Sequence, residues 1–146
     1  MVFSVSIDID LPRDKVISLF DNPDNMKRWQ PGLLSFERLS GTPGHPGARS
    51  RLVYQSGKRR IEMIETVTLR ALPGTMNGTY ETKGIRHEVR NRFESIAPNK
   101  TRWSSENEFR FDSLVMRAFG ALLPGVFRKQ TLTFMTLFKK FAEAQA

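Results

Sequence analysis

Residues 126–144 read VFRKQTLTFMTLFKKFAEA, and this stretch decides the fold because it is the longest amphipathic helical pattern in the chain. Its apolar side chains recur at the spacing of one helix face, and with one residue just upstream they form a stripe of Leu123, Phe127, Phe134, Phe138 and Phe141. The Pro124-Gly125 pair interrupts the pattern and separates it from a further helical stretch over 114–123. A helix with one apolar face must cover another element, so the rest of the chain has to supply that surface.

Upstream of this helix, residues 33–111 alternate apolar and polar side chains with the period of β-strands. Residues that favour turns, mainly Gly, Pro and Asn, divide the alternation into segments. Strands are predicted over 33–39, 48–55, 60–72, 76–83, 87–96 and 101–111. Because parallel strands need crossover connections of about a dozen residues or more, the short turns predict antiparallel hairpins.

The start of the chain adds one strand and two short helices. Residues 2–10 alternate strictly and predict a half-buried strand. A helical stretch over 11–20 follows, with Pro12 suited to its first turn, and a second over 23–29 begins after Asn22, which can cap it. This order predicts an α+β fold with a single domain over residues 1–146, in which the C-terminal helix covers a curved, seven-stranded antiparallel sheet.

Composition excludes several kinds of site. The chain of 146 residues has no cysteine, which excludes disulfides, thiolate metal sites and cysteine nucleophiles. Its two histidines, His45 and His87, are too far apart in sequence for a helical zinc motif, so no metal site is expected. The N-terminus lacks the basic region of a signal peptide, and no apolar run is long enough to span a membrane. We therefore expect a soluble, cytoplasmic protein.

Several short motifs resemble the helix-grip superfamily, which contains START-like proteins, polyketide cyclase/dehydrase and lipid-transport proteins, and relatives of the major birch-pollen allergen. The matching segments are LPRDKV at 11–16, NP at 22–23, WQPG at 29–32, LSG at 39–41, GA at 47–48 and LPGVF at 123–127. The resemblance spans nearly the whole chain and rests mainly on turn and packing positions. It implies a ligand cavity between the sheet and the C-terminal helix. Carriers, cyclases and receptors share this fold, so the resemblance does not select one activity.

The last two predicted strands form a hairpin whose register follows from a tight loop at 97–99. Cross-strand partners share one face of a sheet, so the register also assigns faces. The predicted pairs are Phe93–Trp103 and Asn91–Ser105 on one face, and Arg90–Glu106 and Glu94–Arg102 on the outer face. The outer pairs are read as solvated ion pairs, which contribute roughly 0–1 kcal/mol each.

Alternation in the other strands extends the inner face to a set of candidate ligand-binding residues. The set is mostly apolar with a few polar groups, which is typical of a small-molecule site, whereas a solid core would not bury several amides and a carboxylate. The candidates are Tyr54, Met63, Glu65, Tyr80, His87, Asn91, Trp103, Ser105, Asn107, Phe119, Phe127 and Phe134.

Each polar candidate also has a purely structural interpretation. Glu65 could face water at a strand end or a bulge, and His87 could be a rim residue or a structural histidine. Asn91 and Asn107 could bond each other or the backbone. Trp29 is interpreted as a wedge beneath the second short helix, and the aromatic candidates taken singly fit a core as well as a ligand site.

Three functions remain open from the sequence. The preferred hypothesis is binding of a hydrophobic small molecule, such as a lipid, a polyketide or an aromatic compound, without catalysis. The alternative is a cyclase/dehydratase-type enzyme in which Glu65 is the general base, His87 the acid, and Asn91 or Asn107 orients a carbonyl. Such proton transfers need no cofactor, and none is expected.

The third hypothesis is an interaction surface, because the net charge is +8. The candidate basic residues are Arg49, Arg51, Lys58, Arg59, Arg60, Arg128 and Lys129. The basic run is short and lacks interleaved aromatic residues, so nucleic acid is not an expected partner. A transient contact with an anionic membrane stays open, as does the choice between a monomer and a homodimer.

Overall fold

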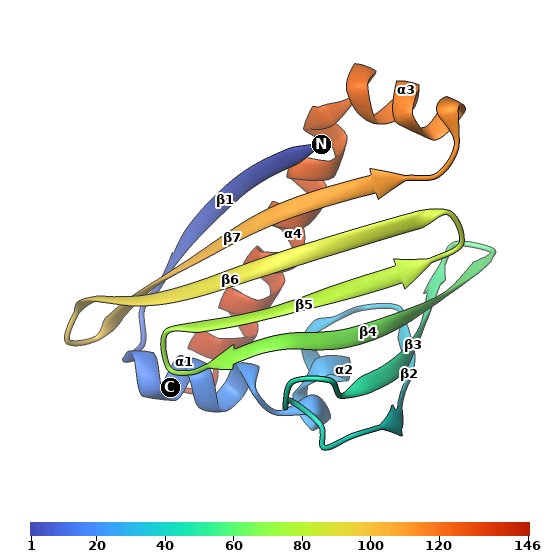
Figure 1. Ribbon diagram of the computed structural model, residues 1–146. Helices are drawn as coiled ribbons and strands as arrows, with labels where there is room; N and C mark the ends of the chain where they lie inside the picture. Colours follow the sequence, from blue (N-terminus) through green and yellow to red (C-terminus); the bar gives the residue numbers. More distant parts are fainter.

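A seven-stranded antiparallel sheet forms the larger part of the computed structural model, which describes residues 1–146 (Figure 1). The strands lie in the order β1-β7-β6-β5-β4-β3-β2, so that the first strand pairs with the last. Their bounds are β1 (Val2–Ile9), β2 (Leu33–Ser40), β3 (Arg49–Ser56), β4 (Arg59–Ala71), β5 (Thr75–Thr82), β6 (Ile85–Ala97) and β7 (Lys100–Phe111). The helices are α1 (Arg13–Phe20), η1 (Pro23–Asn25), α2 (Met26–Trp29), α3 (Leu114–Leu122) and α4 (Pro124–Glu143).

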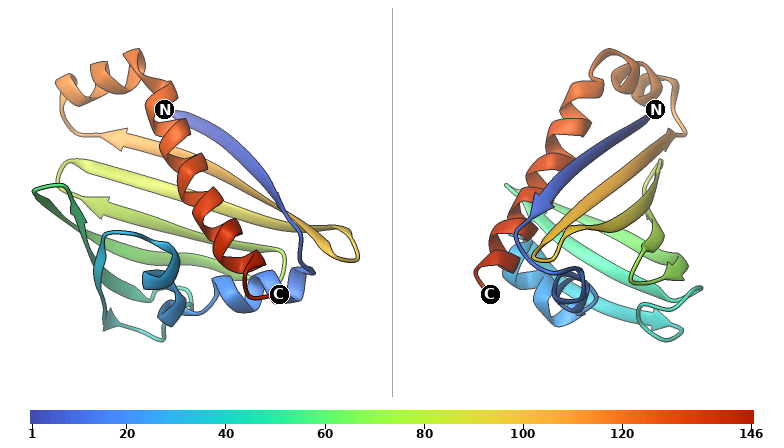
Figure 2. Two further views of the ribbon diagram at one scale, coloured as in Figure 1. Left: turned by 180° about the vertical axis from the view of Figure 1, so that it is seen from behind. Right: turned by 90° about the vertical axis from the view of Figure 1, so that its left-hand side faces the viewer.

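The long helix α4 crosses one face of the curved sheet, while α1 and α2 close one end (Figures 1 and 2). The predicted helix-grip architecture is therefore confirmed. Two predicted helix boundaries were wrong, the break before the long helix and the start of the first short helix, and a proline lies at each. Pro124 is the first residue of α4, with the break at Leu123, and Pro12 precedes α1 as its N-cap. Proline lacks an N–H group and fits where a helix begins, since no intrahelical acceptor is available there. No helix is long and apolar enough to cross a membrane.

The packed core lies at one end of the molecule, where the second half of α4 meets β1, β6, β7 and the short helices. Phe138 of α4 is fully buried, and its ring lies 5.1 Å from Trp29, 5.4 Å from Trp103 and 5.7 Å from Phe20. The buried cluster comprises Val5, Ile9, Leu11, Val16, Trp29, Phe93, Trp103, Met135, Phe138 and Ala142. Trp29 is thus the wedge that the sequence predicts.

The hairpin of β6 and β7 has the predicted register. Phe93 lies opposite Trp103, Asn91 opposite Ser105, and Arg90 opposite Glu106, with which it forms an ion pair. The other predicted ion pair, between Glu94 and Arg102, is wrong although the two residues are opposite each other. Arg102 instead donates two hydrogen bonds to the carboxylate of Asp8 in the neighbouring β1, from Nε to Oδ1 at 2.9 Å and from Nη2 to Oδ2 at 3.2 Å. Two guanidinium nitrogens match two carboxylate oxygens in this geometry.

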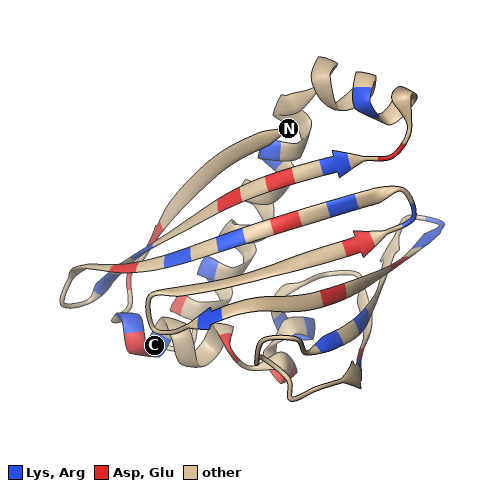
Figure 3. Ribbon diagram, in the orientation of Figure 1, with Lys and Arg blue, Asp and Glu red and all other residues tan.

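The predicted basic patch is divided between distant parts of the sheet. Lys58, Arg59 and Arg60 lie at the turn from β3 to β4, whereas Arg128 of α4 donates a hydrogen bond to the Ser4 carbonyl of β1, at the other edge. Arg51 is paired with Glu37 and Glu62. Figure 3 shows both signs of charge interleaved along the strands. The sheet therefore has no continuous basic face.

Replacing Phe138 with alanine tests whether this core holds α4 in place. We expect the free energy of unfolding to fall by about 3–5 kcal/mol, because the substitution leaves a cavity among three aromatic rings. Chemical denaturation of the purified variant measures the change. Leu132→Ala on the same helix is the matched control: Leu132 is 41% exposed, so its loss should change stability by less than about 1 kcal/mol. Equal losses for the two variants would contradict the assignment.

Candidate functional site

A row of polar side chains crosses the inner face of the sheet, one from each of four adjacent strands. Ser50 of β3 lies opposite Glu65 of β4, Glu65 opposite Tyr80 of β5, and Tyr80 opposite His87 of β6. The row ends at Phe109 of β7, whose ring stacks on the His87 imidazole at 3.9 Å between centroids. Strand alternation places all of them on the same face of the sheet as Phe93 and Trp103 of the core.

From the partial exposure of this row we infer a recess between the sheet and the first half of α4. Glu65, Tyr80 and His87 are only half-buried by accessible surface, yet desolvation by surrounding protein is the largest influence on the pKa of each. A group that is deep within the molecule and still touches solvent-accessible space faces a hollow. The close backbone contacts of α4 are with β1 and α2, which leaves the middle strands uncovered. We call this hollow the sheet–helix recess, lined by Tyr54, Met63, Glu65, Tyr80, His87, Val89, Phe109 and Phe127, all half-buried.

The environment of Glu65 disfavours its charged form. Burial raises the pKa of the Glu65 carboxyl above its ordinary value of 4.5, and a hydrogen bond from Tyr80 opposes part of that rise. Burial, together with the negative charge of Glu65, raises the pKa of the Tyr80 hydroxyl, so Tyr80 stays a hydrogen-bond donor. The interpretation of Glu65 as a water-facing strand-end residue is therefore wrong, since β4 continues six residues beyond it to Ala71.

The environment of His87 fixes its tautomer. The amide nitrogen of Asn107 donates to the carbonyl and the hydroxyl of Ser105, at 3.2 and 3.1 Å, so the amide oxygen is the atom that faces His87. That oxygen lies 2.7 Å from Nε2 of His87 and can only accept, so Nε2 carries the proton. Burial also lowers the pKa of His87 below its ordinary value of 6.5, with the Asn107 bond opposing the shift. Neutral His87 thus presents Nδ1 as a hydrogen-bond acceptor.

Other predicted site residues have structural roles. Trp103 is 2% exposed and belongs to the core, where its indole nitrogen donates to the Asn91 amide oxygen at 2.9 Å. Its assignment to the ligand site is corrected: alternation gives the face of a residue and not its depth below α4. Asn91 and Asn107 bond different partners and not each other. Ser105, which is buried, acts by orienting Asn107.

The aromatic candidates on the helices lie at the margins of the recess. Phe127 of α4 packs on Phe109 at 5.0 Å and lines the recess directly. Phe119 belongs to α3, is 42% exposed, and reaches the recess only through its contact with Phe127. Phe134 is 39% exposed and rests on Trp29 at 4.7 Å. Phe119 and Phe134 are therefore rim residues. Phe119 belongs to α3, which projects past the sheet, and the part of α4 that carries Phe134 packs on α2.

Three residues of the site are absent from the sequence prediction. Gln30, at the end of α2, is buried and accepts a 2.6 Å hydrogen bond from the Tyr54 hydroxyl. Ser50 begins the polar row, and Phe109 stacks on His87. Alternation along β7 and β3 could have found Phe109 and Ser50. Gln30 has no local signal, since only the packing of a turn against β3 brings it to Tyr54.

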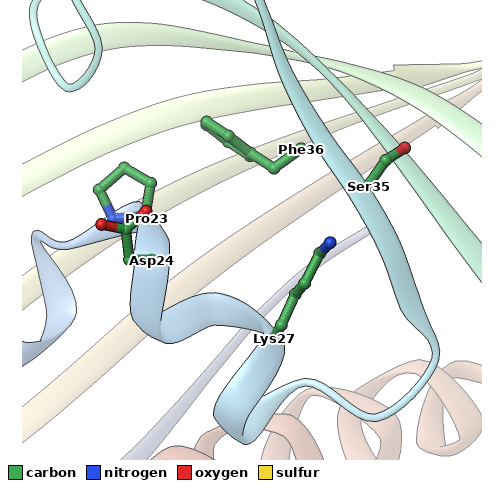
Figure 4. Close-up of a pocket in the computed structure, with 5 residues that line it drawn as sticks. All are labelled: Pro23, Asp24, Lys27, Ser35 and Phe36. Carbon is green, nitrogen blue, oxygen red and sulfur yellow. The ribbon is translucent and has the colours of Figure 1, made fainter.

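Two surface pockets flank this region. One, of about 610 Å³, opens beneath α3 and is lined by residues that include Phe109, Phe111 and Gly120, so it adjoins the polar row through Phe109. Its volume is within the range of small-molecule sites, roughly 300–1,000 Å³. The other, of about 290 Å³, lies between α2 and β2 (Figure 4), where Lys27 extends toward Ser35 and Phe36. No group of three or more His, Asp or Glu side chains is placed to hold a metal ion.

Comparisons with known proteins agree with this fold. The family described as "Polyketide cyclase / dehydrase and lipid transport" matches residues 1–140. A START superfamily protein from Mycobacterium smegmatis is similar in structure, with a TM-score of 0.79 and 13% identity over 99% of each chain. No curated protein matches the sequence at a significant level.

Two solved enzymes are also similar in structure. The Zhui aromatase/cyclase from Streptomyces has a TM-score of 0.79 at 11% identity, over 98% of this chain and 93% of that one. Norcoclaurine synthase from Thalictrum flavum, in complex with dopamine and hydroxybenzaldehyde, has a TM-score of 0.75 at 13% identity, over 100% of this chain and 88% of that one. At these identities the likeness is one of fold.

The substitution Glu65→Gln tests the desolvation of the carboxyl. Because the pKa of Glu65 is raised in the folded protein, the ionised carboxylate disfavours folding once the pH rises above its unfolded value near 4.5. Glutamine removes that charge, so we expect the free energy of unfolding at neutral pH to rise by about 1 kcal/mol. The gain should vanish in acid, where the wild-type carboxyl is protonated. Urea unfolding at both pH values measures it.

Glu62→Gln, on the outer face of the same strand, is the control for this test. Glu62 is exposed and paired with Arg51, so its loss should be neutral or should destabilise by up to about 1 kcal/mol. If Glu65→Gln behaved like this control at both pH values, Glu65 would be a solvated residue.

Proposed function

The chain belongs to the polyketide cyclase/dehydrase and lipid-transport family, and on that premise we propose that it binds a hydrophobic small molecule that carries at least one hydrogen-bonding group. The observation that supports this proposal is the sheet–helix recess, where half-buried apolar side chains surround a desolvated polar row. An apolar lining selects for hydrophobic compounds, and a few fixed polar groups orient them.

The polar row offers both a donor and an acceptor to such a ligand. Protonated Glu65 can present an O–H group, since its pKa is raised, while neutral His87 presents Nδ1; the single O–H of Tyr80 is engaged by Glu65. A ligand carbonyl oxygen near Glu65 and a ligand hydroxyl near His87 would satisfy both. A purely aliphatic chain would leave the Glu65 O–H and the His87 Nδ1 without partners, which is unfavourable by about 1–3 kcal/mol each. We therefore propose an aromatic or polyketide-like ligand over a plain acyl chain.

Filling the recess tests ligand binding. Val89 lies on the inner face opposite Asn107, so Val89→Trp should occupy the space of a ligand. We expect the affinity for the hydrophobic dye anilinonaphthalene sulfonate, and for aromatic carbonyl compounds that displace it, to fall by about tenfold or more. Val53→Trp is the matched control, since Val53 pairs with exposed Glu62 on the outer face of the sheet. Equal affinities in both variants and the wild type would refute the proposal.

A second candidate function is dehydratase- or cyclase-type catalysis, favoured by the opposite pKa shifts of Glu65 and His87. The geometry supports roles opposite to those predicted from the sequence. The single N–H of neutral His87 is engaged by Asn107, so His87 is suited to remove a proton from a carbon beside a carbonyl. Glu65, favoured in its protonated form, is suited to give a proton to a departing hydroxyl, which leaves as water. The proton that His87 accepts is matched by the proton that Glu65 gives, so the elimination of water needs no cofactor.

Turnover of the compounds that displace the dye tests this candidate, with products followed by mass spectrometry. We expect Glu65→Gln and His87→Ala each to lower the rate by about a hundredfold or more while retaining dye binding. The rate should follow a bell-shaped pH profile: it rises as His87 loses its proton and falls as Glu65 loses its own. No conversion of any bound compound, or unchanged rates in both variants, would leave binding as the function.

A further inference from the structure

The charged residues of the helical segment after β7 are basic as far as residue 142. Residues 113–142, which form α3 and nearly all of α4, contain no Asp or Glu, although the chain has 15 acidic residues elsewhere. The same segment contains five basic residues, which are Arg117, Arg128, Lys129, Lys139 and Lys140. The sheet, by contrast, interleaves both signs of charge (Figure 3). Lys139 is paired with Glu143 at the end of α4, so the unpaired positive charge of this segment lies mostly toward α3, at Arg117, Arg128 and Lys129.

The first part of this basic segment also exposes large apolar side chains. Leu114 and Val115 are 78% exposed and Leu122 is 79% exposed, values that leave these side chains almost fully in water. Figures 1 and 2 show α3 projecting beyond the end of the sheet, away from the core. We call this cluster the α3 surface, and it comprises Leu114, Val115, Phe119, Leu122, Leu123 and Val126. Contiguous apolar patches on soluble proteins usually mark a binding surface.

The α3 surface is held in a defined position. Gly120 is buried against Phe111, so closely that a Cβ atom there would lie 2.9 Å from the Phe111 ring. Arg117 donates a 3.0 Å hydrogen bond to the Phe111 carbonyl, and the Ser113 hydroxyl caps the helix by accepting from the Met116 amide. The helix is thus anchored on one side by β7 while its apolar side chains point outward.

We propose that the α3 surface docks onto an anionic lipid bilayer. Exposed apolar side chains flanked by Arg117, Arg128 and Lys129, with Asp112 as the one acidic residue beside α3, match the bilayer interface, where acyl chains lie beneath anionic headgroups. A second copy of this chain is a poorer partner, because it would bring two acid-free, positively charged segments together within a net charge of +8 per chain. The proposal does not rest on what occupies the sheet–helix recess.

Vesicle flotation with the full chain tests the proposal, using vesicles of phosphatidylcholine alone and of phosphatidylcholine mixed equally with phosphatidylserine. We expect binding to the mixed vesicles only, and its loss in high salt. Leu122→Glu should weaken that binding by about tenfold or more, since it places a carboxylate at the headgroups. Ile96→Glu makes the same charge change at a 39% exposed residue near the β6–β7 turn, away from α3, and should bind within about twofold of wild type.

A charge-neutralising pair separates local docking from a net-charge effect. Lys129→Gln in α4 should weaken binding by about fivefold, whereas Lys58→Gln at the β3–β4 turn removes the same charge and should have little effect. Absence of binding to the mixed vesicles, or equal losses within either pair of variants, would overturn the proposal. A dimer in sedimentation analysis that Leu122→Glu dissociates, without vesicle binding by the wild type, would instead assign the α3 surface to a second copy.

Discussion

The packing of Phe138 among Trp29, Trp103 and Phe20 is the contact on which the rest of the molecule depends. It fixes the second half of α4 against α2 and the inner face of the sheet. The first half of α4 contacts only the β1–β7 side of the curved sheet, through Phe127 and Arg128, and stays away from β4, β5 and β6. The recess is inferred where α4 leaves these middle strands, whose inner side chains stay half-buried.

The polar row is the part of the sheet that a solid core would not contain. A half-buried carboxyl, two tyrosines and an imidazole on neighbouring strands disfavour folding through lost solvation. Each of these groups is only partly compensated: Tyr80 bonds Glu65, Tyr54 bonds Gln30, and Asn107 orients His87. Natural sequences retain such local conflicts mainly at functional sites, where partially satisfied groups remain available to a ligand.

The architecture and the strand register could be predicted from the sequence because both are local properties. Alternation sets the face of each strand residue, and the tight turn between β6 and β7 sets which residues lie opposite. Depth is a tertiary property, so the same alternation could not separate Trp103, buried under α4, from His87 in the recess. The ion pair of Arg102 depended on β1, which pairs with β7 across nearly the full length of the chain.

The spatial separation of the packed core from the recess has a consequence for divergence. Side chains that hold α4 sit at one end, and side chains that would meet a ligand sit at the other, so exchanges among the latter leave the anchoring contacts intact. A protein organised in this way can acquire a preference for a new ligand through single substitutions, and each variant along the way still folds. Proteins that share barely one residue in eight with this chain can accordingly retain its backbone.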